Sequence, residues 1–269
     1  MSDLIPPHGG VSTPVDRAVP AEERRQFEGE LTARPKVVVS DADLSTLYRI
    51  GDGGLSPLTG FMDRATYDRV LDEEVIVHDG KKYAWTIPLS LPASEEEAKS
   101  LKPGQAVALV NAQCKPVGGL TVSEVFPFDA ARYVEKVYGT RRFDHPGGQM
   151  AQGEKRPFLV GGEVRVLPQT PHSEYGKYVL SPRQTRALFR EKGWKRVVAF
   201  QTRNPLHHAH EYALVAGLER LTREGHFAGA VLNPLVGETK GDDVDAVTRM
   251  LTHEAHVPNN AMGQGDSDE

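Results

Sequence analysis

The sequence predicts two domains of different fold class: a small β-barrel over residues 1–170 and a doubly wound α/β domain over residues 171–269. Between residues 75 and 125, short apolar or alternating segments are separated by turn residues at the spacing expected of a small barrel. From residue 181 the order changes to helix, strand, polar turn and helix, which is the entry to a parallel sheet covered by helices. The expected fold class is therefore α/β plus β.

The composition is ordinary for a globular protein, with 39% hydrophobic and 26% charged residues in a chain of 269. The net charge of −5 argues against a generally basic surface, so binding to nucleic acid or to acidic lipid is not expected. A site for an anion would have to be built locally, from a few residues that converge on one place.

Cys114 is the single cysteine, which allows no internal disulfide and no cysteine zinc cluster, so a reducing compartment is the simplest expectation. No apolar run approaches the roughly 20 residues that a membrane span needs. The first ten residues lack the basic-then-apolar layout of a secretory signal. Together these features predict a cytoplasmic protein.

Local signals define the elements of the first domain. Ser40 or Asp41 can cap the helix expected over residues 43–50. Asp79-Gly80 is a strong signal for a two-residue hairpin turn. The expected helices cover residues 21–31, 43–50, 93–101 and 129–138. The expected strands cover residues 36–39, 75–78, 82–86, 87–91, 105–111 and 116–125, with a last pair within residues 157–166.

The second domain begins after a proline-rich connection over residues 168–175. Ser181 can cap its first helix, Pro182 suits the first helical position, and Gly193 ends the helix. The elements expected after it are a strand over residues 197–200, a helix to about residue 220, a strand over residues 229–232 and a helix over residues 244–251.

The chain is organised around the stretch Val197–Ala216. Its first four residues are apolar and predict a strand buried on both faces. The polar turn Gln201-Thr202-Arg203-Asn204-Pro205 follows, and its proline suits a helix start. His207 and His210 are three residues apart and share a face on the first turn of the next helix. A strand, a turn and a helix N-terminus in this order present backbone N–H groups to an anion, most often a phosphate, and the guanidinium and imidazoles add further donors.

The run from Gln201 to Pro205, followed by the His-x-x-His pair and Glu211, closely resembles the core motif of the ATP sulfurylase (sulfate adenylyltransferase) family. A His-x-x-His pair after a strand also marks the wider superfamily of nucleotidyltransferases. The resemblance implies a Rossmann-like nucleotidyltransferase domain here. In the first domain, where residues 56–62 look like the N-terminal domain of these enzymes, it implies a PUA-like β-barrel, similar to an RNA-binding module. The predicted barrel strands carry no basic and aromatic strip, so RNA binding is not expected of them.

The activity that the resemblance implies is adenylyl transfer from ATP to sulfate, which gives adenosine 5′-phosphosulfate and pyrophosphate, in sulfate assimilation or in the reverse direction. Sulfate carries no proton at neutral pH, so the site needs fixed positive donors and no general base. By resemblance, Thr202, Arg203 and Asn204 are catalytic, and Gln201 and Arg203 bind sulfate. The implied nucleotide-binding residues are Gln201, Thr202, Arg203, Asn204, His207 and His210. Mg²⁺ is expected to arrive with ATP, with no metal site on the protein itself, and the family implies a homo-oligomer.

The sequence departs from the family's pattern in places. His208 stands where the family usually has arginine, and Asn233 where it usually has histidine. A later segment of the family, Gly-Arg-Asp-His-Ala-Gly, is not found, and neither is the smaller domain that follows it, so the α/β domain is expected to be truncated. Two alternatives therefore stay open: a catalytically incomplete nucleotide-binding remnant, and an adenylyltransferase with a different anionic acceptor.

Other polar residues have simpler interpretations. Lys240 lies either at the nucleotide edge of the site or in a solvated turn, and Asp242 and Asp243 are expected to cap the next helix. The remaining expectations are a loop position for His145, a solvated helix end for His253 and His256, and disorder for residues 263–269.

Overall fold

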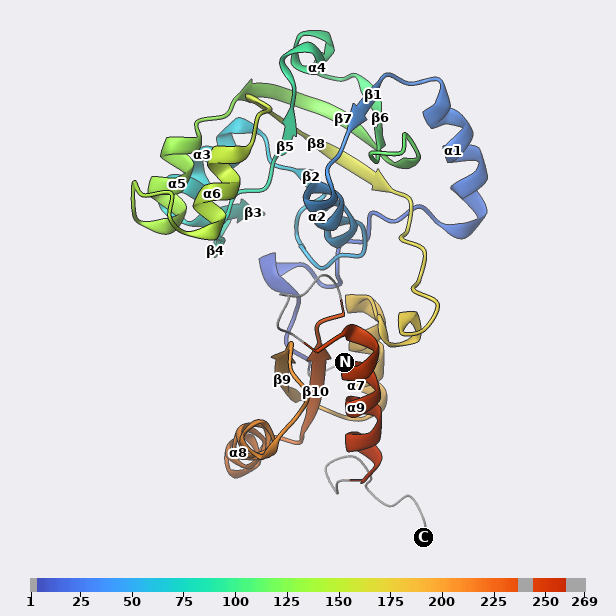
Figure 1. Cartoon of the computed structure of the whole chain (residues 1–269), viewed down its shortest axis with the longest axis vertical. Coiled ribbons are helices and arrows are strands. Elements are labelled where there is room, and N and C mark those ends of the chain that lie inside the picture. The colour runs from blue at the N-terminus through green and yellow to red at the C-terminus, as the bar shows by residue number, and fades with distance from the viewer. Residues whose placement is uncertain (1–3, 237–243, 260–269) are drawn as a thin grey trace. The chain divides into compact units, whose positions relative to one another are not determined.

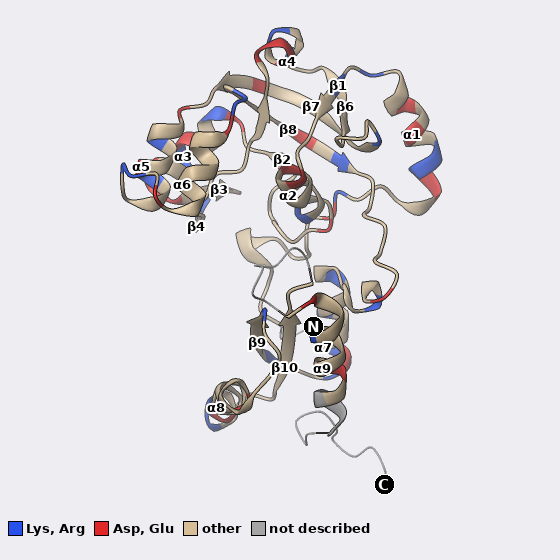
Figure 2. Ribbon diagram, in the orientation of Figure 1, with Lys and Arg blue, Asp and Glu red and all other residues tan. Residues whose placement is uncertain are grey.

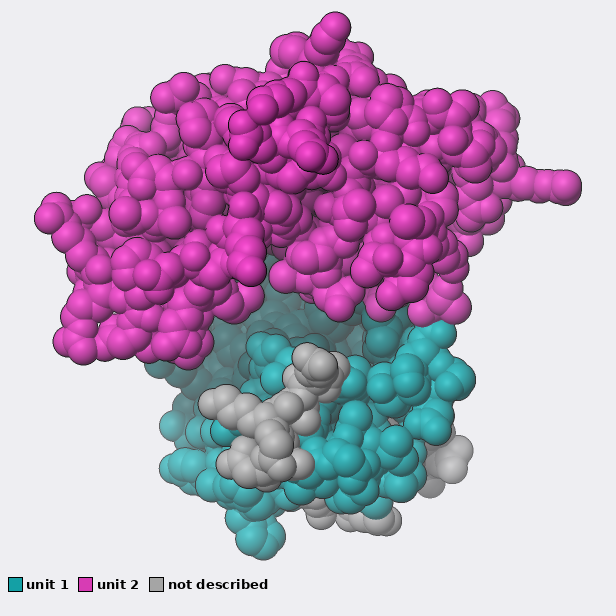
Figure 3. Space-filling view, turned by 45° about the horizontal axis from the view of Figure 1, so that its top comes forward, with its two compact units in different colours: residues 1–5, 171–180, 184–269 teal, residues 6–170, 181–183 magenta. Residues whose placement is uncertain are grey.

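The computed structural model describes residues 4–236 and 244–259. It consists of two compact units, which Figure 3 shows in separate colours. We call residues 6–170 and 181–183 the sheet unit, and residues 1–5, 171–180 and 184–269 the motif unit. Figure 1 labels the helices and strands of both units.

A six-stranded sheet is the framework of the sheet unit (Figure 1). Its strands follow the order β1-β6-β7-β8-β2, and β5 also pairs with β8. The β1–β6 pair is parallel and the other pairs are antiparallel. The strands are β1 (Lys36–Val38), β2 (Gly60–Phe61), β5 (Leu91–Ala93), β6 (Ala106–Val110), β7 (Pro116–Pro127) and β8 (Phe158–Val166). The strand-rich class expected for this part of the chain is confirmed.

A separate hairpin, β3 (Val75–His78) and β4 (Lys81–Ala84), forms where the turn signal predicts it. Asp79 and Gly80 both have positive φ, 47° and 73°, as the favoured two-residue hairpin turn requires. The strand predicted over residues 87–91 is wrong, because pairing begins only at Leu91. Pro88 lacks the N–H group that a ladder needs, which fits its place in a connection.

The helices of the sheet unit begin where side chains can cap them. Ser40 caps α2 in a reciprocal capping box with Asp43, and Ser94 caps α4 with Glu97 in the same way. Asp129 caps α5, and Gly139 ends it with φ +64°. The short helices are η1 (His8–Gly10) and η2 (Ala21–Glu23), and the α-helices are α1 (Arg24–Thr32), α2 (Asp41–Gly51), α3 (Arg64–Glu73), α4 (Glu95–Ser100), α5 (Ala130–Tyr138) and α6 (Pro146–Gly153).

Two α-helices of the sheet unit, α3 and α6, were not predicted. The side chain of Asp63 caps α3 and accepts a hydrogen bond from the backbone N–H of Thr66 at 2.8 Å. His145, expected in a loop, is the cap of α6, and its Nδ1 accepts a hydrogen bond from the N–H of Gly147 at 3.1 Å. The side chain of His145 is therefore engaged by the backbone of its own helix.

Three hydrophobic clusters form the core of this unit. The largest joins α2 to all six strands of the sheet, with fully buried Leu47, Leu91 and Leu109 among its members. The second packs α3 against β3 and the far parts of β7 and β8, and the third packs α1 against the sheet through Phe27 and Leu31. These clusters bury the apolar residues that the strand pattern places on the inner faces.

β8 is one continuous strand, so the prediction of two strands within residues 157–166 is wrong. Gly161 and Gly162 lie inside it, where the β7 register shifts between Val122 and Glu124. Gly162 has φ +156°, and a Cβ on Gly60 of β2 would lie 1.9 Å from the Gly162 carbonyl oxygen. The glycines therefore permit a bulge and a close approach of two backbones, and do not end the strand.

The motif unit contains two parallel strands, β9 (Arg196–Thr202) and β10 (Ala228–Pro234). Helix α8 (His208–Arg223) connects them, which makes a strand–helix–strand unit of the predicted α/β class. The other elements of the unit are η3 (Gly176–Tyr178), α7 (Pro182–Glu191) and α9 (Ala246–Asn259). In Figure 1, α8 and α9 are drawn on opposite sides of the strand pair.

Three expectations for the motif unit need correction. β9 is only partly buried, with Ala199 exposed, because β10 is its sole strand neighbour among the described residues. Helix α8 begins at His208, after Pro205. Helix α9 runs to Asn259, and His253 is 5% exposed within it, so this histidine does not lie at a solvated helix end.

No helix among the described residues is both long enough and apolar enough to span a membrane. Lys and Arg alternate with Asp and Glu over the ribbon, as Figure 2 shows.

Candidate active site

The polar motif lies at the carboxyl end of the parallel strand pair. Gln201 and Thr202 are the last residues of β9, and they pair with Asn233 and Pro234 at the end of β10. In open α/β sheets, ligands bind at this end of the strands. The register therefore places the motif where a parallel sheet presents a binding site.

A short network of hydrogen bonds fixes the turn after β9. The Thr202 hydroxyl oxygen accepts a hydrogen bond from the backbone N–H of Asn204 at 3.0 Å, and the hydroxyl donates to the Asn204 carbonyl oxygen at 3.1 Å. The Thr202 carbonyl oxygen accepts from the N–H of Leu235 at 2.9 Å, which ties the turn to the chain after β10. Thr202 is 7% exposed, so these bonds are largely shielded from water.

The two motif histidines meet at the N-terminus of α8. His207 caps the helix, and its Nδ1 accepts a hydrogen bond from the N–H of Ala209 at 3.3 Å. The His207 and His210 ring centroids are 3.7 Å apart, and the His210 ring is 5.1 Å from the ring of Phe200. The Nδ1 atom of His210 is buried and has no hydrogen-bond partner among the residues that the structure describes. Two imidazole groups thus lie together at the positive end of a helix, a combination suited to phosphate oxygens.

The other predicted site residues lie on the same segment. Gln201 is exposed at the strand end, and Arg203 is half-buried in the turn. His208 points to solvent, and its Nδ1 lies 2.9 Å from the Glu211 carboxylate. Lys240, Asp242 and Asp243 lie outside the described residues.

Sequence reasoning missed two residues that hold this strand end. Arg249 of α9 is 0% exposed, and its guanidinium donates to the carbonyl oxygens of Leu235 and Val244. The Tyr175 hydroxyl donates to the carbonyl oxygen of Val236 at 3.4 Å. Nothing in the sequence pattern distinguishes this arginine from an ordinary surface arginine of a helix.

A cleft of about 580 Å³ adjoins β10 within the motif unit. Its lining residues are Lys177, Tyr178, Leu232, Pro234, Met250, His253 and Glu254. Tyr178 donates a hydrogen bond to Glu254, which lowers the pKa of that carboxyl group. Because Pro234 pairs with Thr202, the cleft reaches the end of β10 that lies beside the motif.

The donors of the motif are amide, hydroxyl, guanidinium and imidazole groups, and these favour anions. In the part of the chain that the structure describes, no three residues of the types His, Cys, Asp or Glu are grouped closely enough to hold a metal ion. The motif's own carboxylate, Glu211, is engaged with His208. The donor types of the motif therefore fit phosphate or sulfate oxygens.

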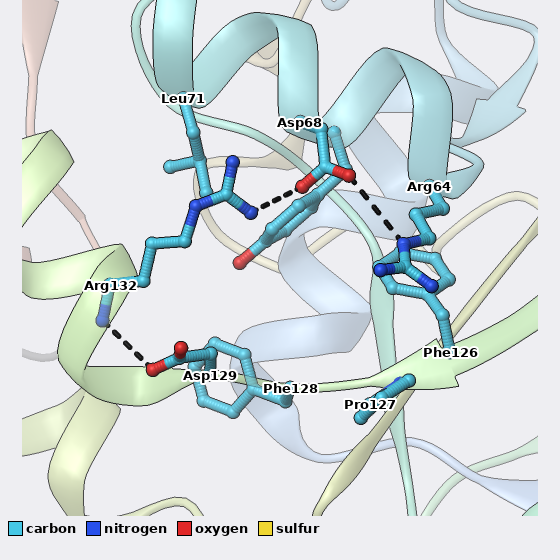
Figure 4. Close-up of a pocket in the computed structure, with 9 residues that line it drawn as sticks. Arg64, Asp68, Leu71, Phe126, Pro127, Phe128, Asp129 and Arg132 are labelled. Carbon is cyan, nitrogen blue, oxygen red and sulfur yellow. Dashed lines mark hydrogen bonds and ion pairs between the residues drawn. The ribbon is translucent and has the colours of Figure 1, made fainter.

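A second cavity, of about 310 Å³, lies in the sheet unit between α3, the end of β7 and α5 (Figure 4). The guanidinium groups of Arg64 and Arg132 flank the Asp68 carboxylate. The backbone N–H of Arg132 donates a hydrogen bond to the Asp129 carboxylate at 2.9 Å. Burial raises the pKa of Tyr67, which also lines the cavity. Because the lining charges satisfy one another, this cavity is a junction between two helices and is not the candidate active site.

The fold and the motif define a class: a β domain followed by a strand–helix–strand unit that carries Arg, His, Thr and Asn side chains at the strand ends. A family model described as a PUA-like domain matches residues 5–169, and one described as ATP-sulfurylase matches residues 176–264. The chain belongs to the ATP-sulfurylase family, with a PUA-like domain ahead of its nucleotidyltransferase-type α/β unit.

The sequences of known relatives align with nearly the whole length of this chain. It is 47% identical to the sulfate adenylyltransferase of Pyropia yezoensis over 272 residues, which is 100% of this chain and 63% of the relative. It is 40% identical to the sulfate adenylyltransferase of Synechococcus sp. (strain JA-3-3Ab), covering 95% of this chain and 62% of the relative. The chain thus spans less than two thirds of the length of these relatives.

Among solved structures, the hexameric APS kinase from Thiobacillus denitrificans is similar, with a TM-score of 0.70 and 24% identity. The similarity covers 96% of this chain and 45% of that one. At this level of identity the likeness supports the fold of both units and carries nothing about activity.

Proposed function

We propose that this site transfers the adenylyl group of ATP to sulfate, giving adenosine 5′-phosphosulfate and pyrophosphate. The observation that carries the proposal is the succession of the Thr202–Asn204 turn and the His207–His210 pair at the start of α8, with the His210 ring beside Phe200 of β9. In a member of the ATP-sulfurylase family, this geometry gathers anion-binding groups at the carboxyl end of a parallel strand pair.

In this reaction a sulfate oxygen forms a bond to the α-phosphorus, and the bond from that phosphorus to the bridging oxygen breaks as pyrophosphate leaves. No proton has to be removed from sulfate, so the residues act by holding two anions together and stabilising charge. We assign Gln201 and Arg203 to sulfate, and Thr202, Arg203 and Asn204 to the reacting phosphate. Arg203 suits a tetrahedral oxyanion because a guanidinium can donate two parallel hydrogen bonds.

His207 and His210 are proposed to bind the phosphate chain of ATP, together with Gln201 and the turn residues. The buried position of the His210 Nδ1 atom supports this assignment. The His210 ring contacts the rings of Phe200 and His207, and these contacts fix its orientation and therefore the direction of Nε2. The helix start adds the positive end of the helix dipole. These donors would stabilise the leaving pyrophosphate most, because negative charge develops on it as its bond to the α-phosphorus breaks.

Mg²⁺ is proposed as part of the substrate, MgATP. The described residues offer the ion no cluster of carboxylates, and Mg²⁺ commonly binds through phosphate oxygens and keeps several of its waters. The chain's own residues would therefore recognise the phosphates.

Three broader features are also proposed. The domain division is placed at residues 1–170 and 171–269, near the boundary between the two family matches. The free, exposed Cys114 suits a reducing compartment such as the cytoplasm. A homo-oligomer is proposed because the similar solved structure is described as hexameric.

The test is pyrophosphate release from MgATP, measured in the full chain with sulfate, with phosphate and with no acceptor. Release that depends on sulfate is expected, and Arg203→Ala should lower it by about 10²–10³-fold because one positioned donor is lost. The control is Arg220→Ala, since Arg220 is a mostly exposed residue paired with Glu224 near the other end of α8.

Near-normal turnover in Arg203→Ala would contradict the assignment of that residue. Release with phosphate in place of sulfate would indicate a different acceptor. ATP binding without any release would indicate a nucleotide-binding remnant, and the proposed reaction would then be wrong.

A further inference from the structure

Arg249 is the largest fully buried side chain among the described residues. It lies in the first turn of α9, and its two terminal nitrogens bind different parts of the chain. Nη1 donates to the carbonyl oxygen of Leu235, just after β10, and Nη2 donates to that of Val244, just before α9. One guanidinium thus joins the point where the chain leaves β10 to the point where it enters α9.

A buried guanidinium is an unusual choice for packing alone. Removing a charge from water is costly, and methionine could fill a similar volume without that cost. The Nε atom of Arg249 has no hydrogen-bond partner in the described part of the chain, so the side chain is not fully compensated. What an arginine provides here, and an apolar residue does not, is a rigid fork that fixes two carbonyl groups at a set separation.

Leu235 connects this fork to the motif. Its carbonyl oxygen is bound by Arg249, and its N–H donates to the carbonyl oxygen of Thr202 at 2.9 Å. The Thr202 hydroxyl in turn accepts from the N–H of Asn204 at 3.0 Å. A continuous series of hydrogen bonds therefore runs from a buried helix side chain to two of the proposed catalytic residues.

The next residue is held from a different element. The Tyr175 hydroxyl donates to the Val236 carbonyl oxygen at 3.4 Å, and the Tyr175 ring stacks on His172 at 3.6 Å. Leu235 and Val236 are therefore held at three points, by the end of β9, by α9 and by the segment before α7. Such convergence is expected where a backbone must keep one conformation beside a reacting group.

We propose that Arg249 is a positioning residue that holds Leu235, and through it the Thr202–Asn204 turn, in the geometry required for adenylyl transfer. It acts through the backbone and does not touch substrate. The effect of Arg249 on turnover rests on the proposed function, whereas its effect on the conformation of the turn does not. A displacement of about 1 Å at a reacting group can cost about 10²-fold in rate, so a remote residue of this kind can have a large kinetic effect.

The first test is amide hydrogen exchange, followed residue by residue by NMR in the full chain. The N–H groups of Leu235 and Asn204 donate the two bonds of the series, so their exchange rates report on it directly. Those of Trp194 and His226 donate comparable bonds at the ends of α7 and α8 and serve as internal references. Arg249→Met should raise exchange at Leu235 and Asn204 by about 10-fold or more, with the references changed by less than about 2-fold.

Two further variants sharpen this test. Leu251→Met changes an exposed residue of the same helix and should leave all four amides unchanged. Arg249→Lys keeps the charge and removes the planar fork, so it should raise exchange at the same two amides by a smaller factor. If Arg249→Met does not fold, the lysine variant decides, and full protection at both amides in it overturns the proposal.

The kinetic test compares kcat and KM for sulfate-dependent pyrophosphate release. Arg249→Met should lower kcat by about 10²-fold, with KM for MgATP changed by less than about 3-fold, and lysine should restore part of kcat. Equal acceleration of exchange at all four amides would assign Arg249 to general stability and overturn the proposal. Absence of pyrophosphate release in the unaltered chain would contradict the proposed function, and the exchange result would still decide the role of Arg249.

Discussion

Arg156 joins two segments of the sheet unit that are far apart in the sequence. Its Nη1 lies 2.8 Å from the Asp43 carboxylate in the first turn of α2, and its Nε and Nη2 bind both oxygens of Glu154 at 2.8 and 2.6 Å. The side chains are 11–21% exposed, so these charges are only partly screened by water. Hydrogen bonds from Arg156 lower the pKa of Glu154 from its ordinary value.

This interaction predicts a pH-dependent stability. A carboxyl group whose pKa is lowered by folding stabilises the protein above its unfolded pKa, and that contribution is lost as the pH falls through the folded pKa. Glu154→Gln should lower the free energy of unfolding by about 2 kcal/mol at pH 7, the range for a hydrogen bond to a charged group. The difference from the unaltered chain should shrink below about pH 4, where glutamate is protonated in the unfolded chain.

Urea unfolding over a pH series measures this difference. Glu96→Gln is the matched control, because Glu96 is an exposed glutamate of α4, and it should change stability by less than about 0.5 kcal/mol at any pH. A Glu154→Gln effect that stays constant from pH 7 to pH 3 would show that the charge of Glu154 does not contribute.

Single residues also show how far a sequence can reveal the site. Thr202, Asn204, His207 and His210 could be proposed together because they follow one another between a strand and a helix, so local geometry alone brings them close. Arg249 could not be found in that way. Its guanidinium binds the carbonyl oxygen of Leu235, which lies about thirty residues after Thr202 in the sequence and pairs with it in the structure. Only the fold creates that contact.

At the scale of elements, local chemistry predicts a boundary where a side chain caps a helix or where a residue can adopt the positive φ that a turn or a helix end requires. The cap at Ser40, the hairpin turn at Asp79-Gly80 and the end of α5 at Gly139 are of this kind, and all three are confirmed. Helix α6 is different, since three of its eight residues are glycine, which favours other conformations. Its buried contacts through Gly148 and Ala151 exist only in the folded unit.

Helix α3 was missed although its signal is present in the sequence. Tyr67, Val70 and Leu71 are spaced as the apolar stripe of a helix, and all three are buried. The reverse error concerns β8, where two adjacent glycines looked like a turn but allow a close backbone approach inside one strand. A glycine pair has either meaning, and the neighbouring strand decides which one applies.

The start of α8 allows its structural and binding roles to be separated. His207 caps the helix through Nδ1, and its ring also contacts the ring of His210. Asparagine is a better capping residue than histidine but has no imidazole ring. His207→Asn should therefore keep the free energy of unfolding within about 0.5 kcal/mol and lower sulfate-dependent turnover by about 10²-fold, as for a lost phosphate donor.

Urea unfolding and steady-state pyrophosphate release measure the two roles on the same samples. His207→Ala should lose both stability and turnover, because it removes the cap as well as the ring. His208→Asn is the control, since His208 is fully exposed and contacts Glu211. Unchanged turnover in His207→Asn would exclude the imidazole from the reaction and leave His207 as a cap alone.

At the scale of the whole molecule, the apolar core is unevenly distributed. The three hydrophobic clusters consist entirely of residues of the sheet unit. In the described part of the motif unit, the buried hydrophobic residues are Leu214 and Met250, whereas Tyr212, Phe227 and Leu251 are 77%, 63% and 58% exposed. Because buried apolar area is the main source of folding free energy, the motif unit should be the less stable of the two.

This difference predicts two unfolding transitions in the full chain, the first from the motif unit and the second from the sheet unit. Calorimetry should resolve them, and Leu214→Ala should lower only the first, while Val164→Ala, in the core of β8, should lower only the second. MgATP binds the motif unit in the proposed function, so at 100 times its Kd it should stabilise that unit by about 2.7 kcal/mol and raise the first transition alone. A single transition lowered by both variants would show that the units unfold together, and a nucleotide shift confined to the second transition would place ATP on the sheet unit and contradict the proposed site.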